Sequence, residues 1–415
     1  MWAISRIKYV ADFEPKCDFS SLSPDSLITY TPMENIKNGY FIPNVAALGT
    51  LSTSLTAYQD NDIVMAKVTP CFENGNIAVM SGLSSGVGLG SSELFVFRAK
   101  EMQTRYLFYW LQNKAFIEQA KSTMTGTGGL KRVSPQFVRD CTIHCPPPDE
   151  QARIAAFLDV KCARINTVIE QTRASIEEYK KLKQAVITQA VTKGIRPGRK
   201  MKDSGVEWIG EIPEEWTVLR KLSYAVNKSI SYGIVKLFDP DDISGVRVLR
   251  CSDVREGKID TSNIRTVAKA VSDEYSRTLL EGGEVLINVR GTLGGCAVVP
   301  PEMRGYNIAR EVAMISLTDA IINRYLMYYF LSKTFGTYEE RHLAGSVYVG
   351  LNIEMLAACP VTLPPLPEQE HIADYLDNKC QAFDTVIAKK SRIIQELESY
   401  KKSLIFEYVT GKKEV

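Results

Sequence analysis

The chain has 415 residues, which is too long for one ordinary core and indicates two or three domains. Hydrophobic residues make up 45% and charged residues 24%, ordinary globular values that exclude a disordered chain. Fifty Lys and Arg against 48 Asp and Glu leave a formal net charge of +2, which excludes a polycationic, histone-like nucleic-acid binder.

Cysteine and histidine usage bears on metal binding and on the compartment. The nine cysteines include no Cys-x-x-Cys pair and the chain has only three histidines, so we expect no zinc site. No apolar run approaches the length of a membrane span, and the start MWAISRIKY lacks a signal-peptide core. We therefore expect a cytoplasmic protein with reduced cysteines.

The first globule is predicted over residues 1–145. Short alternating strands are expected at 62–68 and 92–98, followed by a helix at 104–120, which indicates an α/β domain. The glycine-rich segments GVGLG (86–90) and GTGG (126–129) match neither of the glycine-rich phosphate-binding motifs, and we interpret both as turns.

A long helix is predicted next, over residues 146–194. It begins after the proline cluster in CPPPDEQ (145–151), because proline is tolerated only in the first turn of a helix, and Asp149 and Glu150 complement the helix dipole there. No Gly or Pro follows until after Thr192, so about 43 residues can form a helix of roughly 65 Å. A linker is expected at 195–211.

The second globule is predicted over 212–363 and has the same composition of elements. Strands are expected at 246–254, 283–291 and 310–317, a helix at 323–335, and a hairpin turn at Arg255-Glu-Gly-Lys258. The segment LPPLPEQ (363–369) then begins a second long helix, predicted over 364–412.

The two halves of the chain form an internal repeat. Adding 218 to the numbering gives 17 identities over the 45 positions from 150 to 194, among them Glu150, Gln151 and Asp159, without a gap. A shift of 219 places Arg105, Tyr106 and Tyr109 on Arg324, Tyr325 and Tyr328. The sequences between these landmarks diverge, so the repeat predicts two similar helical segments that carry two different globules.

Apolar residues alternate in steps of four and three along both long helices, with polar interruptions at equivalent layers. This heptad spacing favours a mutual coiled coil over two unrelated amphipathic helices. Parallel helices would need a linker that returns across most of about 65 Å, so we expect antiparallel packing with pseudo-two-fold symmetry. The predicted seam includes Leu158, Ile165, Ile169, Ile176, Leu376, Phe383, Ile387, Ile394 and Leu397.

No convincing enzyme signature is present. The Asn/Asp-Pro-Pro-aromatic tetrapeptide of an amino-methyltransferase is absent. The best approach to a nuclease is Asp242 followed by Glu256-Gly-Lys258, which resembles a metal-holding Asp…Glu-x-Lys arrangement, although the hairpin turn is the more natural interpretation of that segment.

Anion-binding signals are local. Summed formal charges are +1 for residues 1–148, +5 for 149–203, −3 for 204–363 and −1 for the remainder. Individual polar, basic or aromatic side chains in the globules are therefore the candidates for DNA contact, although each basic one alone is more often a solvated charge. The candidates are Lys67, Asn74, Lys131, Arg132, Arg247, Arg250, Arg255, Arg290, Arg310 and Tyr348.

Several motifs together resemble one family. The string DSGVEWIGEIPEEW (203–216), then GEVLINVRGTLGG, PPLPEQEHIADYLD and a long helix, closely resembles the specificity subunit of type I restriction-modification systems. The resemblance covers nearly the whole chain. The first copy departs from the pattern, since it begins almost directly at Trp2 and its KVTPCFENGN (67–76) resembles another variant of the family's globule.

The resemblance implies a fold and a function. The fold would be α/β, with two target recognition domains separated by two long helices that pack as an antiparallel coiled coil. Each domain would read one half of a bipartite asymmetric DNA site, while the helices would set the spacer and dock two methyltransferase subunits. Restriction subunits would join for cleavage, and S-adenosylmethionine, ATP and Mg would be bound by those partners, with no cofactor and no catalysis in this chain.

Two other classes of protein remain open from the sequence. One is a nuclease that uses Asp242, Glu256 and Lys258, and the other is a coiled-coil assembly scaffold without base readout. Neither the recognised bases nor the spacer length follows from the residues, because direct readout depends on which side chains project into the groove.

Overall fold

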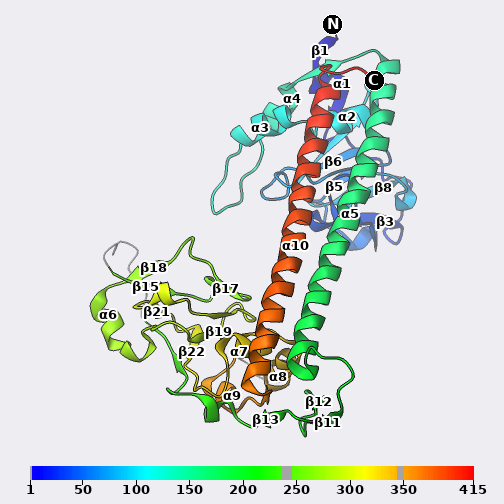
Figure 1. The fold of residues 1–415 in the computed structure, drawn as a ribbon. Coiled ribbons are helices and arrows are strands. Elements are labelled where there is room, and N and C mark those ends of the chain that lie inside the picture. Colours follow the sequence, from blue (N-terminus) through cyan, green and yellow to red (C-terminus); the bar gives the residue numbers. More distant parts are fainter. Residues whose placement is uncertain (1, 236–244, 344–349) are drawn as a thin grey trace. The chain divides into compact units, whose positions relative to one another are not determined.

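The computed structural model describes residues 2–235, 245–343 and 350–415. The chain divides into two compact units, residues 1–173 with 391–415 (unit 1) and residues 174–390 (unit 2). Each unit combines a globule with part of each of the two long helices, α5 and α10 (Figure 1). No helix among the described residues is long and apolar enough to cross a membrane.

The long helices begin and end where the proline and glycine signals place them. Helix α5 spans Pro148–Lys193 and α10 spans Leu366–Val409, 46 and 44 residues, slightly inside the predicted ranges. Both start in a proline cluster, which suits the first turn because those N–H groups have no helical partner. Gly194 and Gly411 follow the last turns with φ of +75° and +70°, the left-handed conformation that glycine adopts most readily at a helix end.

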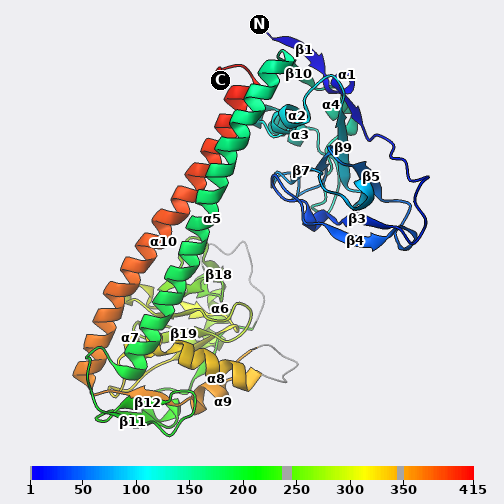
Figure 2. The ribbon, with the colours of Figure 1, turned by 90° about the vertical axis from the view of Figure 1, so that its right-hand side faces the viewer.

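Within each unit the two helices pack antiparallel (Figures 1 and 2). In unit 1, the ring of Phe157 in α5 lies 4.6 Å from that of Tyr408 in α10. Arg173, sixteen residues after Phe157 in α5, pairs with Glu398, which precedes Tyr408 in α10. In unit 2, Lys183 pairs with Asp384 at 2.7 Å. All predicted seam residues are buried or half-buried: Leu158, Ile165, Ile169, Ile176, Leu376, Phe383, Ile387, Ile394 and Leu397. The predicted antiparallel coiled coil is confirmed in both units.

The globule of unit 1 contains two four-stranded sheets, ordered β2-β9-β6-β7 and β4-β3-β8-β5, and a two-stranded pair β1-β10. Its strands are β1 (Ala3–Arg6), β2 (Ala11–Phe13), β3 (Leu27–Thr31), β4 (Asn44–Ala47), β5 (Thr56–Gln59), β6 (Ile63–Ala66), β7 (Ile77–Val79), β8 (Val87–Gly90), β9 (Leu94–Ala99) and β10 (Thr142–Cys145). Its helices are α1 (Ile7–Val10), α2 (Thr104–Trp110), α3 (Lys114–Ser122) and α4 (Pro135–Asp140).

The globule of unit 2 repeats this plan, with sheets β14-β22-β19-β20 and β18-β15-β21 and a pair β13-β23. Two further pairs, β11-β12 and β16-β17, belong to unit 2; β11 and β12 lie near the end of α5 in Figure 2. The strands are β11 (Met201–Asp203), β12 (Glu211–Pro213), β13 (Thr217–Leu219), β14 (Ser231–Tyr232), β15 (Val246–Leu249), β16 (Val254–Arg255), β17 (Lys258–Ile259), β18 (Arg265–Val267), β19 (Val285–Asn288), β20 (Cys296–Val298), β21 (Asn307–Ile308), β22 (Val312–Ile315) and β23 (Val361–Leu363). The helices are α6 (Lys269–Glu274), α7 (Asn323–Phe330), α8 (Lys333–Leu343) and α9 (Ile353–Ala358).

Two predicted helices are each broken in two. The segment 104–120 forms α2 and α3 because the Asn113 side chain accepts a hydrogen bond from Phe116 N–H and starts a new helix. The segment 323–335 breaks in the same way before α8, where Ser332 Oγ accepts from Phe335 N–H. The strand predicted at 246–254 is also interrupted, because a turn at 250–253 separates β15 from β16.

The interpretation of GVGLG as a turn is wrong, because residues 87–90 form strand β8. The glycines are required there by close packing. A Cβ atom on Gly88 would lie 2.3 Å from a ring carbon of Tyr58, so no larger residue fits between β8 and the neighbouring strand β5. The hairpin at Arg255-Glu-Gly-Lys258 is confirmed, with β16 antiparallel to β17.

Equivalent hydrogen bonds connect the globule to the long helices in both units. Tyr106 Oη donates to the Val409 carbonyl at 3.1 Å in unit 1, and Tyr325 Oη donates to the Val191 carbonyl at 3.2 Å in unit 2. Each hydroxyl thus binds a carbonyl in the last turn of one long helix, where no helical partner is available.

A second set of contacts binds each globule to the other long helix. Asp159 accepts from Tyr109 Oη at 2.7 Å and pairs with Arg105. In unit 2, Asp377 accepts from Tyr328 Oη at 2.6 Å and pairs with Arg324. Trp2 Nε1 donates to Glu150 at 3.0 Å, and Trp216 Nε1 donates to Glu368 at 2.9 Å. We call these contacts the mount: Trp2, Arg105, Tyr106, Tyr109, Glu150, Asp159 and Val409 in unit 1, and Trp216, Arg324, Tyr325, Tyr328, Glu368, Asp377 and Val191 in unit 2.

The two mounts differ in their charged groups, since Arg324 in unit 2 also pairs with Asp374, where the repeat places Ala156 in unit 1. In unit 2, the Arg199 guanidinium pairs with Glu368 and lies 5.8 Å from the Trp216 ring. Burial alone would raise the pKa of the Glu368 carboxyl, but hydrogen bonds from Arg199 and Trp216 bring it below its ordinary value of 4.5. The described contacts of Glu150 include no arginine.

Because Arg199 contacts Glu368 but the described contacts of Glu150 include no arginine, glutamine variants of the two glutamates form a matched pair. We expect Glu368→Gln to lower the free energy of unfolding at pH 7 by about 2 kcal/mol, because it removes the buried one of the two carboxylates that pair with Arg199 and leaves only the exposed Glu215. Glu150→Gln should cost less than about 1 kcal/mol, since the amide oxygen still accepts from Trp2. Denaturant unfolding of the full chain measures both.

The pH dependence has a definite sign. Because the Glu368 pKa is lowered on folding, its stabilising contribution is present above pH 4.5 and is lost as the pH falls below that value. The difference between the wild type and Glu368→Gln should therefore shrink in acid. Equal costs for the two glutamine variants at pH 7 would contradict the role given to Arg199.

Candidate nucleic-acid interface

In unit 1, the structure brings the candidate DNA-contacting residues together on two neighbouring loops. The chain leaves β6 into the loop 67–76, and the loop 124–133 between α3 and α4 returns beside it, with Val68 paired to Arg132 in an antiparallel bridge. Val133 N–H donates to the Lys67 carbonyl at 2.9 Å. Lys67, Lys131 and Arg132 therefore lie close together at the end of β6, and Asn74 lies farther along the loop 67–76.

These four side chains differ in what already engages them. Arg132 donates to both carboxylate oxygens of Glu93 at 2.7 and 2.8 Å, and this contact lowers the pKa of the Glu93 carboxyl. The Lys67 ammonium lies 5.5 Å from the centre of the Phe95 ring. Lys131 and Asn74 are exposed, and Lys131 forms no ion pair with any described residue. Among these four residues, Lys131 is thus the cation most available for a phosphate.

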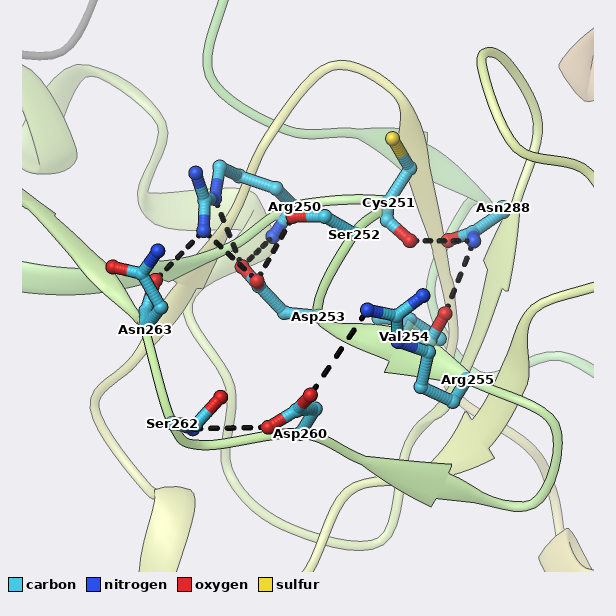
Figure 3. A network of polar contacts seen from close by, with 10 residues as sticks. All are labelled: Arg250, Cys251, Ser252, Asp253, Val254, Arg255, Asp260, Ser262, Asn263 and Asn288. Atoms are coloured by element: carbon cyan, nitrogen blue, oxygen red, sulfur yellow. Dashed lines mark hydrogen bonds and ion pairs between the residues drawn. The ribbon is translucent and has the colours of Figure 1, made fainter. Parts of the chain in front are cut away.

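In unit 2, three arginines lie around two loops that follow strands β15 and β19. Arg250 donates to both oxygens of Asp253 and to the Asn263 carbonyl, so it braces its own turn (Figure 3). Arg255 is exposed and reaches Asp260 only at 4.0 Å. Arg290 is exposed at the start of the loop 290–295, with its guanidinium 5.5 Å from the Tyr232 ring centre. Arg255 and Arg290 are the available cations of this pair of loops.

The remaining candidates lie apart from one another or cannot be placed. Arg247 is exposed on β15 and stacks over Tyr306, 5.4 Å from its ring centre. Arg310 reaches Glu311 at 3.4 Å. Tyr348 lies outside the described residues.

In each unit, one polar side chain that sequence reasoning missed connects the two loops. Asn288, the last residue of β19, donates through Nδ2 to the Cys251 carbonyl of one neighbouring loop (Figure 3) and to the Thr292 carbonyl of the other. Thr69 contacts the loop 124–133 through its hydroxyl. An asparagine within the apolar run VLINV is a signal that could have identified Asn288, because a buried amide needs several partners. Thr69 carries no comparable sequence signal.

The candidate nuclease residues do not form a visible metal site. Glu256 and Lys258 are both exposed and flank Gly257 in the β16-β17 hairpin, and Asp242 lies outside the described residues. Across residues 2–235, 245–343 and 350–415, no group of three or more His, Cys, Asp or Glu side chains is placed to hold a metal ion.

Known proteins are similar to this chain in sequence and in fold. The sequence model of the type I restriction modification DNA specificity domain matches residues 2–178 and 247–399. The specificity subunit of the Escherichia coli EcoEI type I restriction enzyme is 28% identical over 191 residues, 45% of this chain and 32% of that protein. The chain therefore spans about a third of the length of that relative. The putative MjaX specificity subunit of Methanocaldococcus jannaschii is 24% identical over 356 residues, 85% of this chain and 78% of that protein.

Solved structures share the fold at low identity. A chain from a study of complex assembly and conformational transition of the type I R-M system superposes with a TM-score of 0.74, covering 98% of this chain and 97% of that one at 18% identity. The HsdS subunit of Thermoanaerobacter tengcongensis gives a TM-score of 0.50, with coverage of 99% and 97% at 19% identity. Since the family's sequence model matches more than half of the residues and does so in both units, the chain belongs to the type I restriction-modification DNA specificity family.

Proposed function

We propose that this chain is the non-catalytic DNA-recognition subunit of a type I restriction-modification complex in the cytoplasm. The observation that carries the proposal is the repeated mount, which holds two globules by matching contacts while their exposed loops differ. Unit 1 presents the loop 67–76 and unit 2 presents the shorter loop 290–295 in the corresponding place after β6 and β19. Two globules that are held by matching contacts but carry different loops suit a bipartite DNA site with two unequal halves.

The partners follow from the same arrangement. Two matching long helices suit two copies of one partner, and we assign these to modification subunits, with restriction subunits joining for cleavage. S-adenosylmethionine, ATP and Mg would be bound by those subunits. The nuclease and scaffold alternatives are not favoured by any feature of the described residues, and the experiments below separate them from this proposal.

The primary test is the methylation pattern of DNA exposed to this chain together with its modification subunits. We expect methylated adenines within one bipartite asymmetric motif, because each globule supplies one half-site. Sequencing of methylated bases reports both halves and the spacer at once. Methylation without sequence preference would favour the scaffold, and loss of cleavage in a full complex carrying Glu256→Ala would favour the nuclease.

Affinity should be shared between this chain and its partners. The globule regions carry only +1 and −3 formal charges, so they lack the bulk attraction that dominates non-specific DNA binding. We expect weak, salt-sensitive binding by the isolated chain and binding at least about a hundredfold tighter with modification subunits, values typical of added phosphate contacts. Fluorescence anisotropy over a salt series measures this, and tight specific binding by the chain alone would contradict it.

The helices should act as a ruler. Removing one heptad from each, residues 171–177 and 389–395, deletes two turns at equivalent repeat positions without touching either mount. The methylated motif should keep both half-site sequences and change its spacer length. Altered half-site sequences with an unchanged spacer would refute the ruler.

A further inference from the structure

Each globule contains one buried polar side chain that ties the loop after its central strand to a second loop. In unit 2 this residue is Asn288, with 1% of its surface exposed, and in unit 1 it is Thr69, with 9% exposed. The loops that they join carry the available candidate cations Arg255, Arg290 and Lys131. We call Asn288 and Thr69 the bridging residues.

Asn288 holds the two loops of unit 2 through their backbones. Its Nδ2 group, which carries two hydrogens, lies 2.9 Å from the Cys251 carbonyl and 3.2 Å from the Val254 carbonyl in one loop (Figure 3). It lies 3.0 Å from the Thr292 carbonyl in the other loop, so its donor hydrogens are shared among three acceptors. A Cβ atom on Gly295 would lie only 2.2 Å from this nitrogen, so the glycine is needed for the loop to close over the amide.

The amide of Asn288 is not explained by local stability alone. Its Oδ1 atom is buried without a hydrogen-bond partner among the described residues. An unsatisfied buried acceptor costs about 1 to 3 kcal/mol, which offsets much of what the two N–H donors of the amide contribute. Asn288 therefore fixes the relative position of two loops, but burying its oxygen costs free energy that an apolar side chain would not cost.

Thr69 performs the same role in unit 1 with a hydroxyl. Its Oγ1 donates to the Gly129 carbonyl at 2.6 Å and accepts from Lys131 N–H at 2.9 Å, while Thr69 N–H donates to the Lys131 carbonyl at 2.9 Å. Gly128 and Gly129 have φ of +63° and +83°. The bridged loop presents Lys131 and the side chain of Leu130, which is 54% exposed, to solvent.

We propose that Asn288 and Thr69 are positioning residues for DNA recognition, each setting the base discrimination of its own half-site. The inference rests on the proposed function. Direct readout requires donors and acceptors placed within a few tenths of an ångström, and a loop fixed before binding loses less conformational entropy on the DNA. Because the two residues lie in different globules, each serves as the matched control for the other.

The experiment uses the full chain assembled with its modification subunits. Methylation rates are measured on the cognate duplex and on duplexes with single base-pair changes in either half-site. Thr69→Val keeps the side-chain shape but removes both hydroxyl contacts, and we expect the cognate-to-mismatch ratio to fall about tenfold at one half-site only, equivalent to about 1.4 kcal/mol. Asn288→Ala should reduce discrimination at the other half-site, and Thr69→Ser should restore the wild-type ratio within about twofold.

The outcomes separate positioning from simple destabilisation. Unfolding midpoints and co-elution with modification subunits show whether each variant still assembles. Equal effects of a variant on both half-sites, identical behaviour of Thr69→Val and Thr69→Ser, or unchanged discrimination in assembled variants would each overturn the proposal. If Asn288→Ala fails to assemble, the Thr69 pair decides. A wild-type complex without any sequence preference would instead contradict the proposed function.

Discussion

The fold depends on one tyrosine hydroxyl in each globule. Each globule continues along the chain into one long helix, and this hydroxyl binds the end of the other long helix. Tyr106 belongs to the globule that continues into α5, yet it donates to the last carbonyl of α10; Tyr325 precedes α10 and donates to Val191 near the end of α5. Tyr109 and Tyr328 bind the helix that follows each globule, by donating to Asp159 of α5 and Asp377 of α10. Every globule is thereby fixed to two helices, and the antiparallel pairing is built into each unit.

The sequence predicted this framework because the repeat and the mount consist largely of the same residues. Arg105, Tyr106, Tyr109, Glu150 and Asp159 all recur at the repeat spacing, and all of them make mount contacts. The heptad spacing predicted the helix pair for a related reason, since the seam is a periodic pattern that one sequence displays on its own.

The remainder was not predictable because it depends on contacts between segments distant in sequence. GVGLG is a strand because the Tyr58 ring packs against it, which the glycines alone do not reveal. Arg250 and Arg290 are alike in sequence, but Asp253 pairs with the guanidinium of Arg250, whereas that of Arg290 is exposed and lies over the Tyr232 ring. Which cations are available for DNA is therefore decided by partners within the fold, and Thr69 acquires its role only when a loop sixty residues away returns to it.

Tyr106 and Tyr325 bind main-chain oxygen rather than any particular side chain of the opposite helix. Every helix of this kind ends with unpaired carbonyls, so the final turn can change its residues without losing the contact. The remaining mount partners recur in both copies. A globule cut at its mount and inserted at the other position would thus meet the equivalent glutamate, aspartate and helix-end carbonyl, while Arg199 and Asp374 belong to the second position alone. Under the proposed function, the two half-site readers would then be exchangeable modules.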